Sequence, residues 1–203
     1  YPTRSFDQVS PKVALVWEAR SWLSLRASYG QGFRPPALFD LYGLSVITAG
    51  PTTLVYEPSP GLVPERVQAF EVGADAALAA GGRASATLYR QRLQDLVYRR
   101  TLATSTAAVT RTRAENVGEA DVDGIEADVR WPIGLPGLRV FGAFTHQFRY
   151  EISRNDAAPE TVGKKLTDVP ETVWSAGLEY QRDAWAALLA VRHVDHVFGS
   201  GDD

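Results

Sequence analysis

The chain has 203 residues, of which 45% are hydrophobic and 22% are charged, a composition typical of folded domains. The net charge of −3 predicts no basic surface for nucleic acid, and the absence of cysteine excludes disulfides, thiolate metal sites and a cysteine nucleophile. The chain also lacks methionine, so we expect a processed product or a fragment. The sequence contains no run of about 18 apolar residues, so it predicts no transmembrane helix.

The first two predicted strands cover residues 12–19 and 22–30. In the second, Leu23, Leu25 and Ala27 alternate with polar residues that include Arg26. Successive side chains of a strand point to opposite faces, so one face is apolar and the other polar. Proline has no N–H to donate, so the prolines at 35 and 36 predict that this strand ends near Gly32. Residues 31–64 are then expected to form a long irregular loop, which is usually functional.

Six further segments alternate in the same way and predict about eight strands in all, with no convincing helix. They cover residues 66–79, 83–99, 113–131, 138–150, 172–180 and 184–196. Phe141 interrupts an otherwise polar face. Charged side chains on the predicted inner face are those of Arg26, Arg83, Arg130 and Arg139.

The connections alternate in length along the chain. Short connections are predicted at 18–21, 80–82, 132–137 and 181–183, and long ones at 31–64, 100–112 and 151–168. Short turns at one end and long loops at the other are typical of an up-and-down membrane barrel. Trp17, Trp22, Trp131 and Trp185 all lie near the short turns, where indole rings would form a girdle at the membrane interface. Mean hydropathy of −0.16 is compatible with this architecture, because alternating strands hide their lipid face from an average.

The sequence predicts neither an enzyme nor a metal or cofactor site. His193 and His196 are three residues apart and would face opposite sides of a strand. The carboxylate pairs Glu71 with Asp75 and Glu126 with Asp128 share a face, but strand geometry places the carboxylates of each pair at least about 7 Å apart, too far for retaining glycoside chemistry. We interpret these groups as charges that line a polar lumen.

Several motifs, in order over residues 10–195, resemble the barrel of TonB-dependent outer-membrane receptors. The segment from Tyr29 to Tyr42 (YGQGFRPPALFDLY) is similar to the family's YGRGFRAPTLxELY. LVPE at 62–65 with FEVG at 70–73 is similar to LKPE…yElG, and NVGEA at 116–120 with VDGIE at 122–126 is similar to NVGKAxxxGvE. The family's strand starts are matched by Ser10-Pro11-Lys12 and by Asp168-Val169-Pro170.

The resemblance implies an all-β fold, with about eight antiparallel strands of a 22-stranded transmembrane barrel, short periplasmic turns and long extracellular loops. It implies an active-transport receptor in the outer membrane of a Gram-negative bacterium, most simply for an iron–siderophore complex. Its implied partners are outer-membrane lipid, the nutrient ligand and TonB, with no nucleic acid. We expect residues 1–203 to be a partial barrel domain without the N-terminal plug, through which TonB acts, and without the first and last strands.

The resemblance assigns the matched motif residues to structural roles at the bases of extracellular loops. They are Gly32, Phe33, Arg34, Pro35, Pro36, Leu38, Asp40, Tyr42, Pro64, Glu65, Asn116, Gly118, Gly124 and Glu126. Ligand contacts are expected nearer the loop tips, at Tyr42, Tyr56 and Arg154.

Three alternatives stay open from the sequence. The same family includes cobalamin and haem receptors. A complete eight-stranded membrane barrel, of the adhesin or anchor type, fits the strand count, because eight strands fill their own interior. A soluble all-β binding module is the third alternative.

Overall fold

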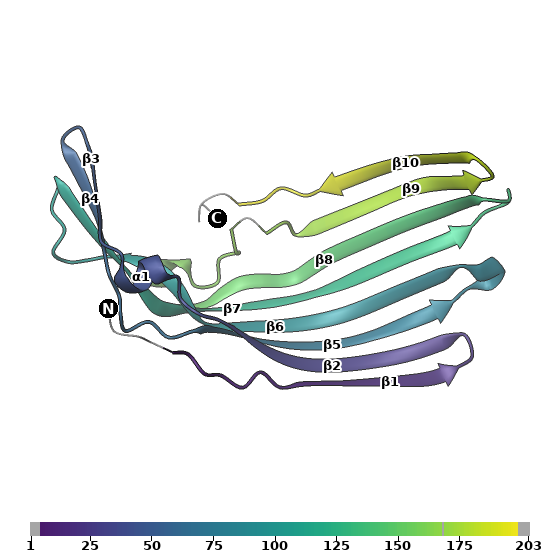
Figure 1. Ribbon diagram of the computed structural model, residues 1–203, viewed down its shortest axis with the longest axis horizontal. Coiled ribbons are helices and arrows are strands. Elements are labelled where there is room, and N and C mark those ends of the chain that lie inside the picture. Colours follow the sequence, from purple (N-terminus) through teal and green to yellow (C-terminus); the bar gives the residue numbers. More distant parts are fainter. Residues whose placement is uncertain (1–4, 168, 199–203) are drawn as a thin grey trace.

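The computed structural model describes residues 5–167 and 169–198, and its main feature is one long antiparallel sheet. Eight strands follow one another in chain order across this sheet (Figure 1). They are β1 (Lys12–Arg20), β2 (Leu23–Arg34), β5 (Glu65–Ala77), β6 (Arg83–Thr101), β7 (Val109–Pro132), β8 (Leu138–Asn155), β9 (Thr172–Arg182) and β10 (Trp185–Val194). This up-and-down order confirms the fold predicted from the alternating sequence. Asp168, the first residue of one strand-start motif, lies outside the described residues.

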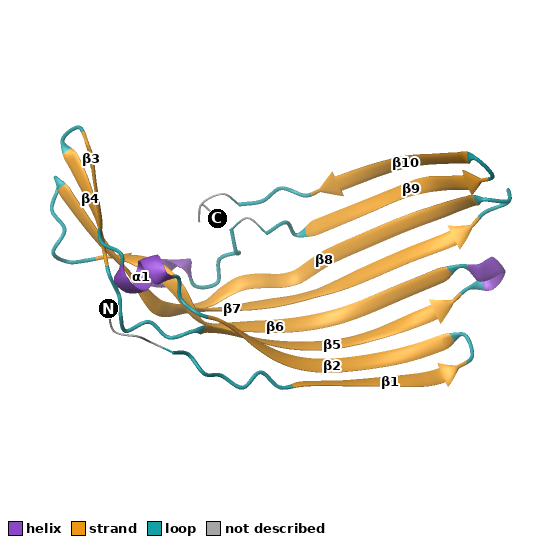
Figure 2. Cartoon of the chain, in the orientation of Figure 1, coloured by secondary structure: helices purple, strands orange, loops and turns teal. Residues whose placement is uncertain are grey.

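The connection between β2 and β5 is more ordered than predicted. It contains the helix α1 (Leu38–Tyr42) and a hairpin of β3 (Ser45–Ala49) and β4 (Thr52–Glu57), and β4 pairs in parallel with β7 (Figure 2). The prediction of an irregular loop without a helix was therefore wrong. Short 3-10 turns lie at Ala79–Gly81 and Pro159–Thr161.

The predicted end of the second strand was also wrong. The strand continues to Arg34, and Gly32, Phe33 and Arg34 pair with Val67, Arg66 and Glu65 of β5. Only the prolines at 35 and 36 lack a backbone N–H. The three residues before them can therefore still pair with β5. Similarly, β6, β7 and β8 extend further into the predicted loops than the alternation alone indicated.

Loop lengths sort by the end of the sheet, as predicted. Residues 21–22, 78–82, 133–137 and 183–184 connect strands at one end, on the right of Figure 1. Residues 35–64, 102–108 and 156–171 connect them at the other end, on the left. We call these the short-turn end and the loop end.

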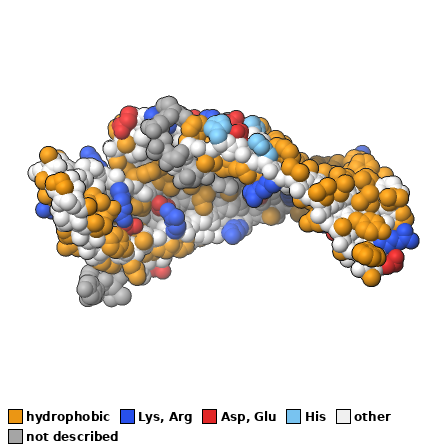
Figure 3. Space-filling view, turned by 90° about the horizontal axis from the view of Figure 1, so that it is seen from above, with side chains coloured by type: hydrophobic (Ala, Val, Ile, Leu, Met, Phe, Trp, Pro, Cys, Tyr) orange, Lys and Arg blue, Asp and Glu red, His pale blue; other side chains and the backbone are white. Residues whose placement is uncertain are grey.

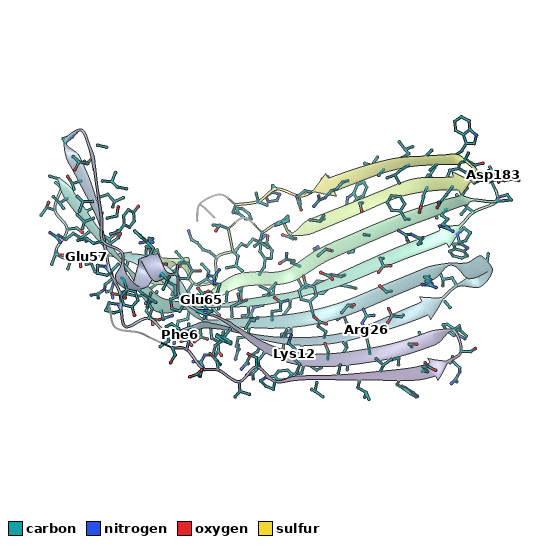
Figure 4. All side chains as sticks on the ribbon, viewed as in Figure 1. Phe6, Lys12, Arg26, Glu57, Glu65 and Asp183 are labelled. Carbon is teal, nitrogen blue, oxygen red and sulfur yellow. The ribbon has the colours of Figure 1, made fainter. Side chains whose placement is uncertain are left out.

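One face of the sheet is polar. Directly paired residues of neighbouring strands lie on the same face, and the register joins Arg26 to Gly73, Gly73 to Thr87 and Thr87 to Glu126. Arg26, labelled in Figure 4, forms an ion pair with Asp75 at 2.5 Å. The register also places on this face the other three predicted inner arginines, Arg83, Arg130 and Arg139. In a barrel this face lines the lumen.

Phe141 is the aromatic exception on the polar face. It is paired with Gly177 of β9, and a Cβ built on that glycine would lie 2.5 Å from a ring carbon of Phe141. The absence of a side chain at 177 therefore makes room for the ring, which covers the neighbouring backbone instead of pointing into open space.

The opposite face is apolar and exposed. Among its large side chains, Phe70 is 51% exposed, Leu88 49% and Phe144 41%. Along β8 this face runs from Leu138 to Phe148, about 33 Å of strand and about 23 Å of height at a 45° tilt, which is close to the apolar band of a membrane barrel. Toward the loop end the band gives way to charged pairs, such as Arg90 with Asp123 at 2.9 Å.

Four tryptophans lie near the short-turn end and are exposed, as the sequence predicted. They are Trp17, Trp22, Trp131 and Trp185, with exposed fractions from 40% to 76%. Figure 3 shows hydrophobic side chains gathered at this end of the molecule. These positions agree with an interfacial aromatic girdle.

The sheet is an open arc in the part of the chain that the structure describes. There, β1 pairs only with β2 and β10 only with β9, and every residue of β10 is exposed. A closed eight-stranded barrel would pair β1 with β10, so this arrangement argues against the small complete barrel. No helix among the described residues has the length and apolarity to cross a membrane.

Candidate functional site at the loop end

A small buried cluster anchors the loop end. Leu41 of α1 and Leu62 are each 2% exposed and pack with Ala114 of β7. Phe6, Tyr42 and Val97 pack around them. The helix is only five residues long and has no side-chain cap, so this packing, rather than helix propensity, holds it in place.

Glu65 joins three elements beside this cluster. It is 8% exposed and carries an ion pair with Arg34 of β2. Its other carboxylate oxygen accepts the backbone N–H of Val97 in β6 at 2.9 Å. The carboxylate thereby satisfies a backbone donor next to an irregularity in the β6–β7 register, between Leu93 and Leu96.

Asn116 makes a second link of the same kind. Its side-chain oxygen accepts the N–H of Val63 at 2.8 Å, and its amide nitrogen donates to the carbonyl oxygens of Val63 at 3.0 Å and of Asp95 at 2.6 Å. These bonds fix the segment that contains Pro64 against β6 and β7. The structure therefore brings Arg34, Glu65 and Asn116 together, although they come from three separate sequence motifs.

The remaining motif residues are spread along the strands. Gly32 and Phe33 lie in β2, Pro35 and Pro36 follow it, and Leu38 is 76% exposed at the start of α1. Gly118 lies in β7 beneath the ring of Tyr98, where a Cβ would overlap the ring. Further down β7, Gly124 and Glu126 share the face of Arg26, away from the loop end.

The three residues expected to contact ligand do not form one site. Tyr42 packs against the buried cluster. The ring of Tyr56 lies under the guanidinium of Arg99, with 4.7 Å between the guanidinium carbon and the ring centroid. Arg154 lies elsewhere, on β8, and pairs with Glu119 at 3.2 Å.

Arg99 is a residue that the sequence did not single out. It donates to Asp40 of α1 at 2.5 Å and stacks over both Tyr56 and Phe39, so it ties β6 to α1 and β4. Cation–π contacts of this kind depend on the approach of distant segments. No sequence motif around residue 99 predicts these contacts.

The connection between β8 and β9 folds back onto β8. The N–H of Leu166 donates to Tyr150 and that of Gly163 to Ile152, each at 2.8 Å. Lys165 donates to Glu171 at 2.8 Å, and its ammonium group lies 5.2 Å from the centroid of the Tyr150 ring. The bond from Lys165 lowers the pKa of Glu171 below its ordinary value.

This pKa shift predicts a pH-sensitive loop. A lowered folded-state pKa gives stabilisation that is complete above the unfolded-state pKa and lost as pH falls through the folded-state pKa. We expect the protection of the Leu166 amide against hydrogen exchange, corrected for intrinsic rates, to be complete above about pH 4.3, the ordinary glutamate pKa, and to decrease as the pH falls below it. Glu171→Gln should lower this protection at neutral pH and remove its pH dependence. The amide of Val129, near the short-turn end of β7 and far from this loop, is the control; an equal response there would contradict a local effect.

The histidines show no shared ligand geometry. His193 stacks on Trp174 with 5.6 Å between ring centroids, whereas His196 contacts Asp195 and Phe198. No group of three or more potential metal-ligating side chains occurs among the described residues.

An up-and-down antiparallel arc with one polar face, one apolar exposed face and loops sorted to one end defines the class of outer-membrane β-barrels. A family model for the β-barrel of TonB-dependent receptor-like proteins matches residues 1–203. The chain therefore belongs to this family, whose members are transport receptors of the outer membrane of Gram-negative bacteria and not enzymes.

Solved structures of low sequence identity share the fold. The ferric enterobactin receptor PfeA of Pseudomonas aeruginosa matches with a TM-score of 0.67 and 18% identity over 86% of this chain and 26% of its own. The siderophore receptor PirA of Acinetobacter baumannii matches with a TM-score of 0.68 and 17% identity over 86% of this chain and 27% of its own. The Serratia marcescens hemophore receptor HasR, solved with its hemophore and heme, matches with a TM-score of 0.69 and 18% identity over 91% and 32%.

The chain thus spans about a third or less of the length of these receptors. No curated protein sequence matches it.

Proposed function

We propose that this chain is an arc of the barrel of an outer-membrane receptor that imports an iron–siderophore complex by TonB-dependent active transport. The family match over residues 1–203 is the observation that carries this proposal. The siderophore receptors among the structural neighbours support the choice of ligand. In this proposal a plug domain and further strands, one beside β1 and one beside β10, complete the receptor in the outer membrane.

The unpaired edges of the sheet support the proposed completion of the barrel. β1 and β10 both present a full row of backbone donors and acceptors along one side, together with exposed apolar side chains. Such edges are poorly tolerated in lipid, where backbone groups need partners. The arc alone is therefore not expected to transport, and it should associate with other copies when isolated.

A haem receptor is the second candidate, because HasR superposes on a larger share of the chain than the two siderophore receptors do. A cobalamin receptor is a further candidate of the same functional class.

Deletion of the gene and complementation test the proposal. Under iron limitation, the deletion strain should lose uptake of radiolabelled iron supplied as a ferric siderophore, and the intact gene should restore uptake only in a strain with functional TonB. Growth on haem as the sole iron source separates the second candidate. Unchanged uptake of every iron source, or a gene without a region that encodes a plug-like domain, would contradict the proposal.

A further inference from the structure

A basic cavity of 620 Å³ lies at the loop end, between the end of β6 and the folded-back connection after β8. Its volume is within the range of small-molecule sites. Apolar atoms of Ile152 and Leu166 form part of its wall. Its charged lining residues are all cationic, with no aspartate or glutamate among them: Arg99, Arg100, Lys164 and Lys165.

The cavity lies on the lumen-facing side of the sheet. From Gly118 to Glu126 the strand β7 alternates without an inserted residue, so Gly118 shares the polar face of Glu126 and Arg26. The ring of Tyr98, which lines the cavity, covers Gly118, and Asn155, which also lines it, is the strand partner of Gly118. A solute that enters the lumen from the loop end therefore meets this cavity, whereas the predicted ligand residue Arg154, paired across the strands with Glu119, belongs to the other face.

The cationic groups are positioned but remain accessible. Lys165 is held by Glu171, and 40% of its side chain is exposed. Arg100 reaches Glu115 only at 3.4 Å and is 52% exposed, while the pKa of Glu115 is lowered chiefly by its bond to Arg113. Arg100 thus keeps N–H donors for a ligand. Guanidinium and ammonium groups fixed by neighbours bind anionic oxygens with little further ordering cost.

We propose that this cavity binds an anionic iron chelate, one that presents carboxylate or catecholate oxygens, rather than a neutral corrinoid or a cationic hydroxamate. This inference rests on the proposed function and specifies the chemical class of its ligand. The anionic groups contact Arg100, Lys164 and Lys165, and the ring of Tyr98 with the apolar wall supports the body of the chelate. Opposite charge at the lumen mouth also raises the association rate at low salt.

Binding to the whole receptor, purified in detergent, tests the class. The probes are ferric enterobactin, ferric citrate, a cationic ferric trihydroxamate and cyanocobalamin, each titrated by quenching of tryptophan fluorescence. We expect an anionic chelate to bind most tightly, with affinity that falls as salt rises. Arg100→Gln with Lys164→Gln should weaken it by about 10–100-fold, the range of one or two charge-assisted hydrogen bonds. Arg182→Gln, at the short-turn end, is the matched control.

Each outcome decides a different question. Tight binding of the cationic trihydroxamate, or equal affinities of the cavity variant and the Arg182→Gln control for an anionic chelate, overturns the cavity assignment and leaves the siderophore-receptor function standing. Tight binding of cyanocobalamin overturns both the cavity assignment and the siderophore-receptor function. Failure of every probe to bind wild-type receptor overturns both. Native migration of the unheated variants on gels, matched to wild type, excludes misfolding as the cause of a loss.

Discussion

Replacement of Ala127 by arginine is expected to destabilise the membrane-inserted receptor by about 2–4 kcal/mol. Ala127 lies on the apolar face of β7, where it pairs with Ala86 and Phe144. It is halfway between Trp131, near the short-turn end, and Asp123, where the charged pairs begin. A guanidinium group in the middle of the apolar band is surrounded by lipid hydrocarbon. The cost of desolvating its charge is larger than any other effect of the bigger side chain. Urea unfolding in lipid vesicles, followed by tryptophan fluorescence, measures the change.

The control is the same substitution one strand away on the other face. Ala143 is paired with Asp128 and Ser175, so an arginine there faces the polar lumen beside a carboxylate. Ala143→Arg should change the free energy of unfolding by less than about 1 kcal/mol, as exposed ion pairs do. Equal costs for the two variants would contradict the assignment of the faces.

Removal of the Glu65 carboxylate has the second large expected effect. Glu65→Ala leaves the partly buried N–H of Val97 without its acceptor, at a cost of about 1–3 kcal/mol. The lost ion pair adds less than about 1 kcal/mol, because the Arg34 side chain is 78% exposed. We therefore expect a total of about 1–4 kcal/mol, measured by the same unfolding experiment.

Glu65→Gln separates the hydrogen bond from the charge. Glutamine keeps an acceptor for the N–H of Val97, so its cost should be about 1 kcal/mol. A second measure is local: only the alanine variant should lose hydrogen-exchange protection at Val97. If Glu65→Ala were as stable as wild type, the carboxylate would have no structural role at this loop base.

The strand faces were predictable because side chains alternate between the two faces along a strand, and this alternation can be read from neighbouring residues alone. Arg26 among Ser24 and Ser28, and Leu23 among Leu25 and Ala27, already specify which face is polar. The loop-length pattern and the tryptophans then gave the direction of the arc, and the motifs gave the family. All of these signals are local, or consist of short local segments in a fixed order.

The parts that sequence missed depend on contacts between distant segments. The β3–β4 hairpin is short, and β4 gains a second partner strand only when it reaches β7. Arg99 acquires its role from α1 and β4, and the basic cavity combines β6 with residues more than fifty positions later. Its lysines, 164 and 165, carry no motif, so only the folded-back loop shows that they line the same space as Arg100.

Thiol accessibility tests the central claim, that one face of the arc meets lipid and the other lines a polar lumen. The chain contains no cysteine, so none of its native side chains reacts with a thiol label. Single cysteines are introduced in place of Ile125, Glu126, Ala127 and Asp128. In receptor inserted in membranes, a charged maleimide should label positions 126 and 128 and leave 125 and 127 unmodified until detergent is added. Uniform labelling of the four positions, or the reverse alternation, would contradict the account.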